Sequence, residues 1–167
     1  MSAIDGLFDE YASSHKNKTN KAIHWVCIPL IMLSLLGVLW TIPHDYFAGI
    51  LPYDLLNWAT IFVAVTLVYY IYLSRVIFLG MIPVAAGILA LNYWLMQWGA
   101  ANGIAHIYTS VVIFVGAWIG QFIGHKIEGK KPSFFKDLQF LLIGPAWLLG
   151  HLFRKAGIPY SQATAAA

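Results

Sequence analysis

Residues 23–42 read IHWVCIPLIMLSLLGVLWTI and contain no Asp, Glu, Lys or Arg. A helix needs about 20 apolar residues to cross the hydrocarbon core of a bilayer. Three further segments pass this test, namely Leu55 to Ser74, Val76 to Trp98 and Ile104 to Gly124. Backbone polar groups cannot stay unpaired in lipid, and the period-2 alternation of barrel strands is absent, so all four are expected to be helices. The predicted fold class is all-α, a polytopic integral membrane helical bundle.

The composition of the whole chain supports a membrane protein. Of its 167 residues, 60% are hydrophobic and 10% are charged, whereas soluble domains have about 25% charged residues. We expect one transmembrane domain over residues 1–160 and a disordered, Ala-rich tail over residues 161–167. No signal peptide is predicted, because the first 22 residues contain three acidic side chains and no continuous apolar region. The single cysteine, Cys27, excludes disulfides within the chain and thiolate metal sites.

A fifth apolar run, from Leu138 to Phe153, is too short to span comfortably and contains the pair Gly144-Pro145. Proline ends or kinks a helix, and irregular backbone at membrane depth must be buried in protein. We therefore predict a short re-entrant or interfacial helical segment near the C-terminus.

The N-terminal residues show the spacing of an amphipathic helix. Three acidic residues occupy one side, and the other side carries Ile4, Leu7, Phe8, Tyr11 and His15. Such a helix is typical of segments that lie on a membrane surface. We expect Asn20, which follows it, to cap the first spanning helix.

The ten Lys and Arg residues can all be placed on one face of this bundle. With a cytoplasmic N-terminus, that face carries Lys16, Lys18, Lys21, Arg75, Lys126, Lys130, Lys131, Lys136, Arg154 and Lys155, and the opposite loops hold only Asp45 and Asp54. This is the positive-inside pattern. It predicts insertion into a bacterial inner membrane or the endoplasmic reticulum. The basic residues flank apolar runs, so we expect membrane lipid, and not nucleic acid, as a partner.

The same topology divides the six histidines. His15, His24, His125 and His151 fall at the basic face, and His44 and His106 fall at the opposite face. Four neutral imidazoles at one level of a bundle could hold a divalent transition metal such as iron, zinc or copper. The alternative is that they are interfacial histidines whose polar tips reach the lipid head groups.

Neighbouring residues favour the metal site. Gln121, His125 and Glu128 share one helical face, and metal-bound histidines need hydrogen-bonding neighbours that fix their tautomer. We predict catalytic roles for Gln121 and Glu128 beside the metal, although Glu128 could instead pair with Lys131. Tyr11 lies one turn before His15 and is expected to support that ligand.

Three glycines in the last predicted span, Gly116, Gly120 and Gly124, form a stripe of small residues. Such a stripe lets a second helix approach closely, so we assign it to packing. The sequence lacks the GxSxG elbow, the Walker loop and the dinucleotide-binding GxGxxG pattern. It also lacks the closely spaced histidine boxes of membrane di-iron desaturases.

Two motifs resemble a known family. The first, Y-x3-H-x4-N-x3-H-x4-P, consists of Tyr11, His15, Asn20, His24 and Pro29; the second, W-x2-QF-x-GH-x2-E-x3-P, consists of Trp118, Gln121, Phe122, Gly124, His125, Glu128 and Pro132. Both resemble the small membrane proteins that include the yeast 2-hydroxy fatty acid dioxygenase of phytosphingosine α-oxidation. The similarity extends from about Phe8 to Gly157.

The resemblance implies an Fe(II)-dependent dioxygenase that converts 2-hydroxy fatty acids with O2 to fatty acids one carbon shorter. It implies that His15, His24 and His125 bind the iron and that Asn20 supports them, whereas His151 is assigned from topology alone. Glu128 would restore a site of two histidines and one carboxylate if it turned inward. Two other functions stay open: a non-catalytic lipid-binding or scaffolding membrane protein, and a zinc-dependent membrane lipid hydrolase.

Overall fold

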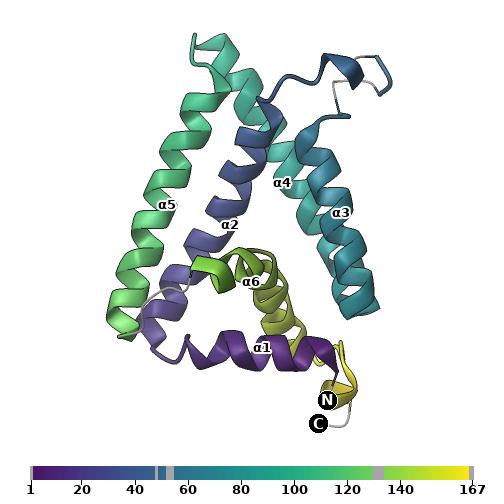
Figure 1. Cartoon of the computed structure of the whole chain (residues 1–167), viewed down its shortest axis with the longest axis vertical. Helices are drawn as coiled ribbons and strands as arrows, with labels where there is room; N and C mark the ends of the chain where they lie inside the picture. Colours follow the sequence, from purple (N-terminus) through teal and green to yellow (C-terminus); the bar gives the residue numbers. More distant parts are fainter. Residues whose placement is uncertain (1, 48, 52–54, 130–133, 166–167) are drawn as a thin grey trace.

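The computed structural model describes residues 2–47, 49–51, 55–129 and 134–165, and this part of the chain is helical without strands. Figure 1 shows long helices that run along the height of the molecule, with the N-terminal helix and the last long helix of the chain lying across its lower end. In chain order the elements are α1 (Ala3–Ser13), α2 (Lys18–Trp40), the 3-10 turn η1 (Asp45–Phe47), α3 (Trp58–Leu73), α4 (Arg75–Ala101), α5 (His106–Glu128), α6 (Phe134–Lys155) and α7 (Gln162–Ala165).

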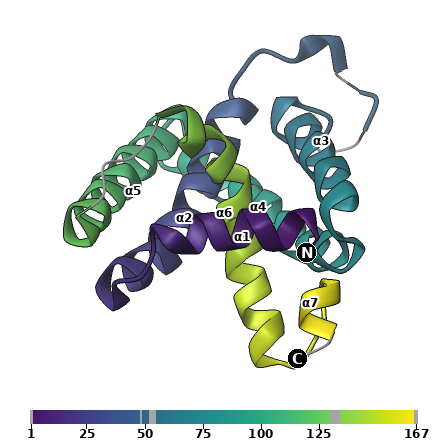
Figure 2. The ribbon, with the colours of Figure 1, turned by 60° about the horizontal axis from the view of Figure 1, so that its bottom comes forward.

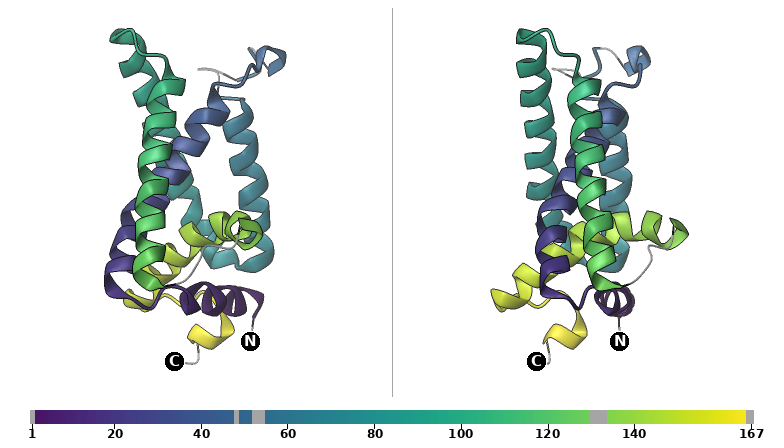
Figure 3. Two further views of the ribbon diagram at one scale, coloured as in Figure 1. Left: turned by 60° about the vertical axis from the view of Figure 1, so that its left-hand side comes forward. Right: turned by 90° about the vertical axis from the view of Figure 1, so that its left-hand side faces the viewer.

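Three helices, α2, α4 and α5, are long and apolar enough to cross a membrane. The second predicted span, α3, has only 16 residues, which is about 24 Å at 1.5 Å per residue. It begins late because Asn57 caps it, accepting hydrogen bonds from the backbone of Ala59 and Thr60 at 2.9 and 3.2 Å. It ends at Leu73 because the extended Ser74 caps the next helix. Four spans are therefore not confirmed, although α3 runs back beside α4 toward the end where α1 and α6 lie (Figures 1 and 3).

The amphipathic N-terminal helix is confirmed as α1. Ser2 caps it through reciprocal hydrogen bonds with Asp5, in which the Asp5 carboxylate accepts from the Ser2 hydroxyl at 2.6 Å. Its apolar stripe, Ile4, Phe8 and Tyr11, is buried. Seen from the lower end, α1 crosses α6 below the long helices (Figure 2). The stripe belongs to one buried cluster with Ile143, Ala146 and Trp147 of α6, so it packs against protein and not against the membrane surface.

The expected interruption of the helix at Gly144-Pro145 is wrong, because α6, which is 22 residues long, continues through this pair. The Tyr70 hydroxyl donates to the Leu142 carbonyl at 2.5 Å, which attaches α6 to α3 three residues before the proline. Close neighbours hold the segment as well: a Cβ at Gly144 would lie 3.3 Å from Ile28 Cδ1. The helix lies across the lower end of the molecule (Figures 1 and 2) and is not among the helices fit to span. That placement is what an interfacial segment requires.

The predicted N-cap at Asn20 is also wrong. Asn17 caps α2, accepting from the backbone of Thr19 at 2.8 Å and of Asn20 at 3.3 Å. The helix starts before the apolar run because Asn17 provides an acceptor for its first free N–H groups. Asn20 is the third residue of α2 and is fully buried. Its side chain therefore does not cap the helix.

The predicted glycine stripe lies where α2 meets α5, the most extensive helix pair in the molecule. A Cβ at Gly120 would lie 2.5 Å from the Cys27 sulfur, and one at Gly124 would collide with the Asn20 side-chain oxygen. A Cβ at Gly116 would meet nothing. Two of the three glycines therefore permit the close approach, and it occurs toward the basic end of α5.

The chain end differs from its prediction, because residues 162–165 form the short helix α7 where disorder is expected. Ser161 and Thr164 cap it: the Thr164 backbone donates to the Ser161 hydroxyl at 3.2 Å, and the Ser161 backbone donates to the Thr164 hydroxyl at 2.9 Å. Tyr160, just before it, is buried. Predictions for Asp54, Lys130, Lys131 and residues 166–167 lie outside the described residues.

Candidate metal centre

Three histidines from three different elements converge at the basic end. His15 lies in the turn between α1 and α2, His24 in the second turn of α2, and His125 in the last turn of α5. Each offers one ring nitrogen, and these nitrogens lie within 4.8 Å of one another. The ring centroids of His15 and His24 are 4.3 Å apart, and that of His125 is 5.6 Å from His15 and 5.1 Å from His24. His15 and His24 are almost completely buried.

Backbone hydrogen bonds fix the tautomers of two of these rings. His15 Nδ1 donates to the Tyr11 carbonyl at 2.6 Å, and His24 Nδ1 donates to the Asn20 carbonyl at 2.9 Å. A carbonyl can only accept, so in each neutral ring the proton is on Nδ1 and Nε2 keeps its lone pair. His15 Nε2 is buried without a hydrogen-bond partner. An imidazole held through one nitrogen and open at the other is the arrangement that metal ligands show.

The electrostatic surroundings keep His15 neutral. Burial lowers the pKa of His15 below its usual 6.5, and the positive charges that His125 and Lys21 can carry lower it further. The hydrogen bond to Tyr11 opposes this shift. Near pH 7 the ring is therefore the neutral form that binds a metal ion.

Tyr11, one turn before His15, contacts the His15 ring with its own ring as well as with its backbone. The two rings stack with centroids 4.1 Å apart and planes 9° from parallel. Tyr11 also contacts Phe140 and Trp147, with centroids 5.4 and 5.2 Å away. Aromatic packing therefore fixes the plane of the His15 ring, while the backbone of the same tyrosine fixes its tautomer.

Glu128 lies at the turn that carries His15. Its Oε1 accepts from the Lys16 backbone N–H at 2.8 Å, and its Oε2 accepts from the Asn17 backbone N–H and the Asn20 amide, both at 2.9 Å. Both carboxylate oxygens thus join the end of α5 to the start of α2. The structure gives Glu128 a positioning role, and its alternative partner Lys131 lies outside the described residues.

Gln121 and Asn20 form the buried polar lining between α2 and α5. Gln121 lies one turn before His125 and is 7% exposed, and its Oε1 is buried without a hydrogen-bond partner. Asn20 supplies a carbonyl to His24 and an amide to Glu128. The asparagine therefore links one predicted ligand to the carboxylate that holds the turn.

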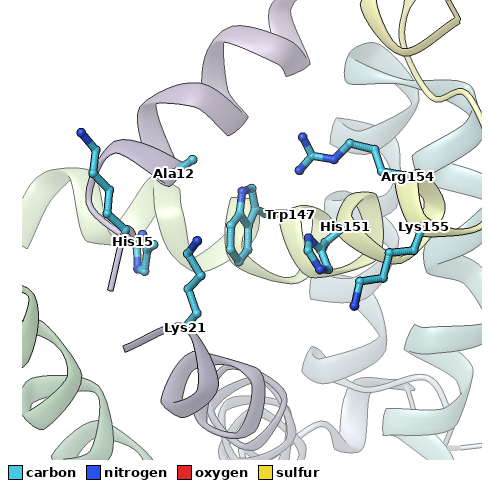
Figure 4. A pocket seen from close by; sticks show the side chains of 8 residues that line it. Ala12, His15, Lys21, Trp147, His151, Arg154 and Lys155 are labelled. Atoms are coloured by element: carbon cyan, nitrogen blue, oxygen red, sulfur yellow. The ribbon is translucent and has the colours of Figure 1, made fainter. Parts of the chain in front are cut away.

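The structure does not bring His151 into this cluster. The Trp147 indole stands between His15 and His151 (Figure 4), with ring centroids 6.0 Å from His15 and 6.3 Å from His151. His151 also packs edge-on against Trp25 at 5.7 Å. The three convergent histidines lie on α2, α5 and the turn before α2. His151 lies on α6, on the other side of the Trp147 ring from His15.

A cleft of about 600 Å³ that the sequence did not reveal opens beside Trp147 and is lined by both His15 and His151. Trp147 and four basic side chains line it, and none of them belongs to the two motifs. A signal was present, because Trp147, His151 and Arg154 recur at helical spacing and so share one face of the last apolar helix.

The donor set fits a transition metal. Three neutral imidazoles suit iron, zinc, copper or nickel, and two of the three rings, His15 and His24, are buried. Among known proteins, a family described as 2-hydroxy-palmitic acid dioxygenase Mpo1-like matches residues 1–156. No curated protein and no solved structure matches the chain.

Proposed function

Because the chain belongs to the 2-hydroxy-palmitic acid dioxygenase Mpo1-like family, we propose that it is an Fe(II)-dependent membrane enzyme. It would convert 2-hydroxy fatty acids with O2 to fatty acids one carbon shorter. The observation that carries this proposal is the buried cluster of His15, His24 and His125, whose ligand atoms lie within 4.8 Å of one another. Apolar helices fit to cross a membrane agree with a lipid substrate.

In this proposal His15, His24 and His125 hold the metal, each through one ring nitrogen. When bound, iron would supply the electrons for O2 and a template for the substrate. The three-imidazole set has no carboxylate among the described ligands, so the metal would keep its full positive charge, which favours an anionic substrate. The carboxylate of a 2-hydroxy fatty acid meets that requirement.

The remaining residues would act by position. Tyr11 and Asn20 keep the lone pairs of His15 and His24 available through their carbonyls. Glu128 holds the turn that carries His15. For Gln121 we keep the predicted catalytic role, as an acceptor for the substrate's 2-hydroxyl hydrogen, because its buried amide oxygen is unpartnered. Burial of His15 and His24 limits the access of water to these two ligands.

The test combines metal analysis with oxygen uptake. Wild-type protein purified in detergent and reconstituted with Fe(II) should contain about one iron per chain and consume O2 when 2-hydroxypalmitate is added. His125→Ala should lose both properties. A reconstituted wild type without bound transition metal would overturn the proposal.

Zinc-dependent lipid hydrolysis is a second candidate, favoured by the same observation, because three histidines are a known ligand set of catalytic zinc. The two functions differ in their need for oxygen. Product formation under strict anaerobiosis would support the hydrolase, and strict dependence on O2 would support the dioxygenase.

A further inference from the structure

A strongly basic cleft lies directly beside the metal centre. It measures about 600 Å³ and is bounded by His15 and Trp147 and by the basic residues Lys16, Lys21, Arg154 and Lys155. The side chains come from the α1–α2 turn, the start of α2 and the last turns of α6. Figure 4 shows Lys21 and Arg154 extending toward the space around Trp147.

The basic side chains that line the cleft act on His151, which lines it with them. Partial burial lowers the pKa of His151, and the positive charges of Lys155, Arg154 and Lys21 lower it further. Lys21 lines the cleft together with both histidines, and Figure 4 shows its side chain between the His15 and Trp147 rings.

No carboxylate is among the side chains that line this cleft in the described chain. Like charges gathered in a hollow repel each other, and the repulsion is relieved when an anion binds. Arginine presents a planar fork that matches a carboxylate, and lysine adds a point charge. The Trp147 ring gives the same cleft an apolar wall, so its chemistry suits an anionic group attached to a hydrocarbon chain.

We propose that this cleft is the carboxylate-binding subsite of the enzyme, in which Lys21 and Arg154 hold the head group of the fatty acid next to His15. The inference rests on the proposed function and adds to it the residues that orient the substrate. A carboxylate held there places carbon 2, the carbon that carries the hydroxyl, beside the His15 edge of the metal centre. His151 then belongs to the wall of this subsite.

Binding without turnover tests the subsite. Palmitate and palmitamide have the same chain and differ in charge, and neither has the 2-hydroxyl group of the proposed substrate. Wild-type protein in detergent should bind palmitate at least 10-fold more tightly than palmitamide. Lys21→Gln together with Arg154→Gln should reduce this ratio to about one, and Arg154→Lys should retain most of it.

Matched controls remove one lysine and one arginine that lie outside the cleft. Lys18 and Arg75 are exposed and do not line the cleft, so Lys18→Gln with Arg75→Gln should leave the palmitate preference intact. Equal binding of palmitate and palmitamide by the wild type would overturn the subsite, and so would a preference that survives in the cleft variant. Thermal melting of each variant confirms that it is folded.

The outcomes also separate the subsite from the proposed function. Palmitate selectivity that depends on Lys21 and Arg154, in a protein that consumes no O2, would support the subsite and refute the dioxygenase. Normal O2 uptake with an unchanged KM in the cleft variant would refute the subsite alone, because loss of a substrate-holding charge should raise KM. Phosphatidylglycerol that displaces palmitate completely at equal concentration would also refute it and assign the cleft to phospholipid.

Discussion

Each of two histidines donates its Nδ1 proton to the carbonyl four residues earlier. In an α-helix such a carbonyl accepts from the backbone N–H four residues later. His15 lies just beyond the end of α1, and His24 lies within α2, where its ring shares the Asn20 carbonyl with the helix backbone. Because this hydrogen bond uses Nδ1, it leaves the Nε2 lone pair of each ring available to a metal. At the residue scale, the metal-binding state is thus set before any metal arrives.

Removal of one ligand should abolish stoichiometric metal binding. His24→Ala leaves two imidazoles, and the buried space it vacates offers no replacement donor among the residues of the cluster. The measurement is iron per chain after reconstitution and gel filtration. His44→Ala, at the opposite end of the bundle, should bind as much iron as the wild type; equal loss in both variants would contradict the assignment.

The metal-free protein should lose stability as the pH falls below about 6.5. The pKa of His15 is lower in the folded protein than the usual 6.5, so the unfolded chain binds more protons in this range and is favoured by acid. Thermal melting between pH 7.5 and 5 should therefore show a smaller decline in His15→Gln than in the wild type. Parallel declines would show that His15 titrates normally.

Glu128→Ala should weaken the metal site without removing a ligand. The change deletes acceptors for Lys16, Asn17 and Asn20, so the turn that carries His15 loses its attachment to α5. Partners that orient metal ligands contribute about 10- to 100-fold in affinity, and we expect a loss in this range. Glu128→Gln, which retains an acceptor oxygen, should lose less. An unchanged iron titration in Glu128→Ala would contradict the positioning role.

At the scale of elements, the contact between α2 and α5 decides whether the site exists. Its two helices carry His24 and His125, which are 101 positions apart in the sequence. Their approach depends on positions where a side chain would collide with α2. The glycine stripe, predicted from the sequence as a packing feature only, is therefore also a condition for the metal centre.

Gly124→Ala should destabilise the protein and lower its iron affinity, because the new methyl group would collide with the Asn20 side chain and would lie 3.4 Å from the His24 ring. We expect a loss of about 1–3 kcal/mol, typical of overpacking in a well-packed interior. Gly116→Ala is the matched control. It meets nothing within 4 Å and should be neutral or slightly stabilising, since alanine favours the helix. Melting in detergent and iron titration measure both effects, and similar losses at the two positions would contradict the model of close approach.

For the molecule as a whole, the described basic residues flank helix ends that lie at one end of the structure. These are the start of α2, the start of α4, and the ends of α5 and α6 (Figure 3). The metal centre and the basic cleft lie at the same end. Under the proposed function, membrane orientation decides from which compartment the metal and the substrate head group arrive.

Accessibility to a membrane-impermeant thiol reagent should confirm the orientation and the number of spans. Cys27 is buried, so single cysteines introduced at exposed positions report cleanly. Lys18→Cys and Arg75→Cys should react from the cytoplasmic side, and Tyr46→Cys, whose native side chain is 91% exposed, from the opposite side. Reaction of Arg75→Cys from the same side as Tyr46→Cys would show that α3 does not cross and that the chain has three spans.

The sequence by itself determined the helical class, the amphipathic first helix and the candidate ligands His15, His24 and His125. These follow from local properties, since apolar length, helical periodicity and histidine spacing all act within one segment. Only the tertiary structure decided that Glu128 holds a turn, that Trp147 lies between His15 and His151, and that α6 runs through Pro145. Each of these depends on partners more than 70 positions away or on side-chain direction across a helix pair. The same is true of the basic cleft, because Lys21 and Arg154 come together only when α6 folds back across the start of α2.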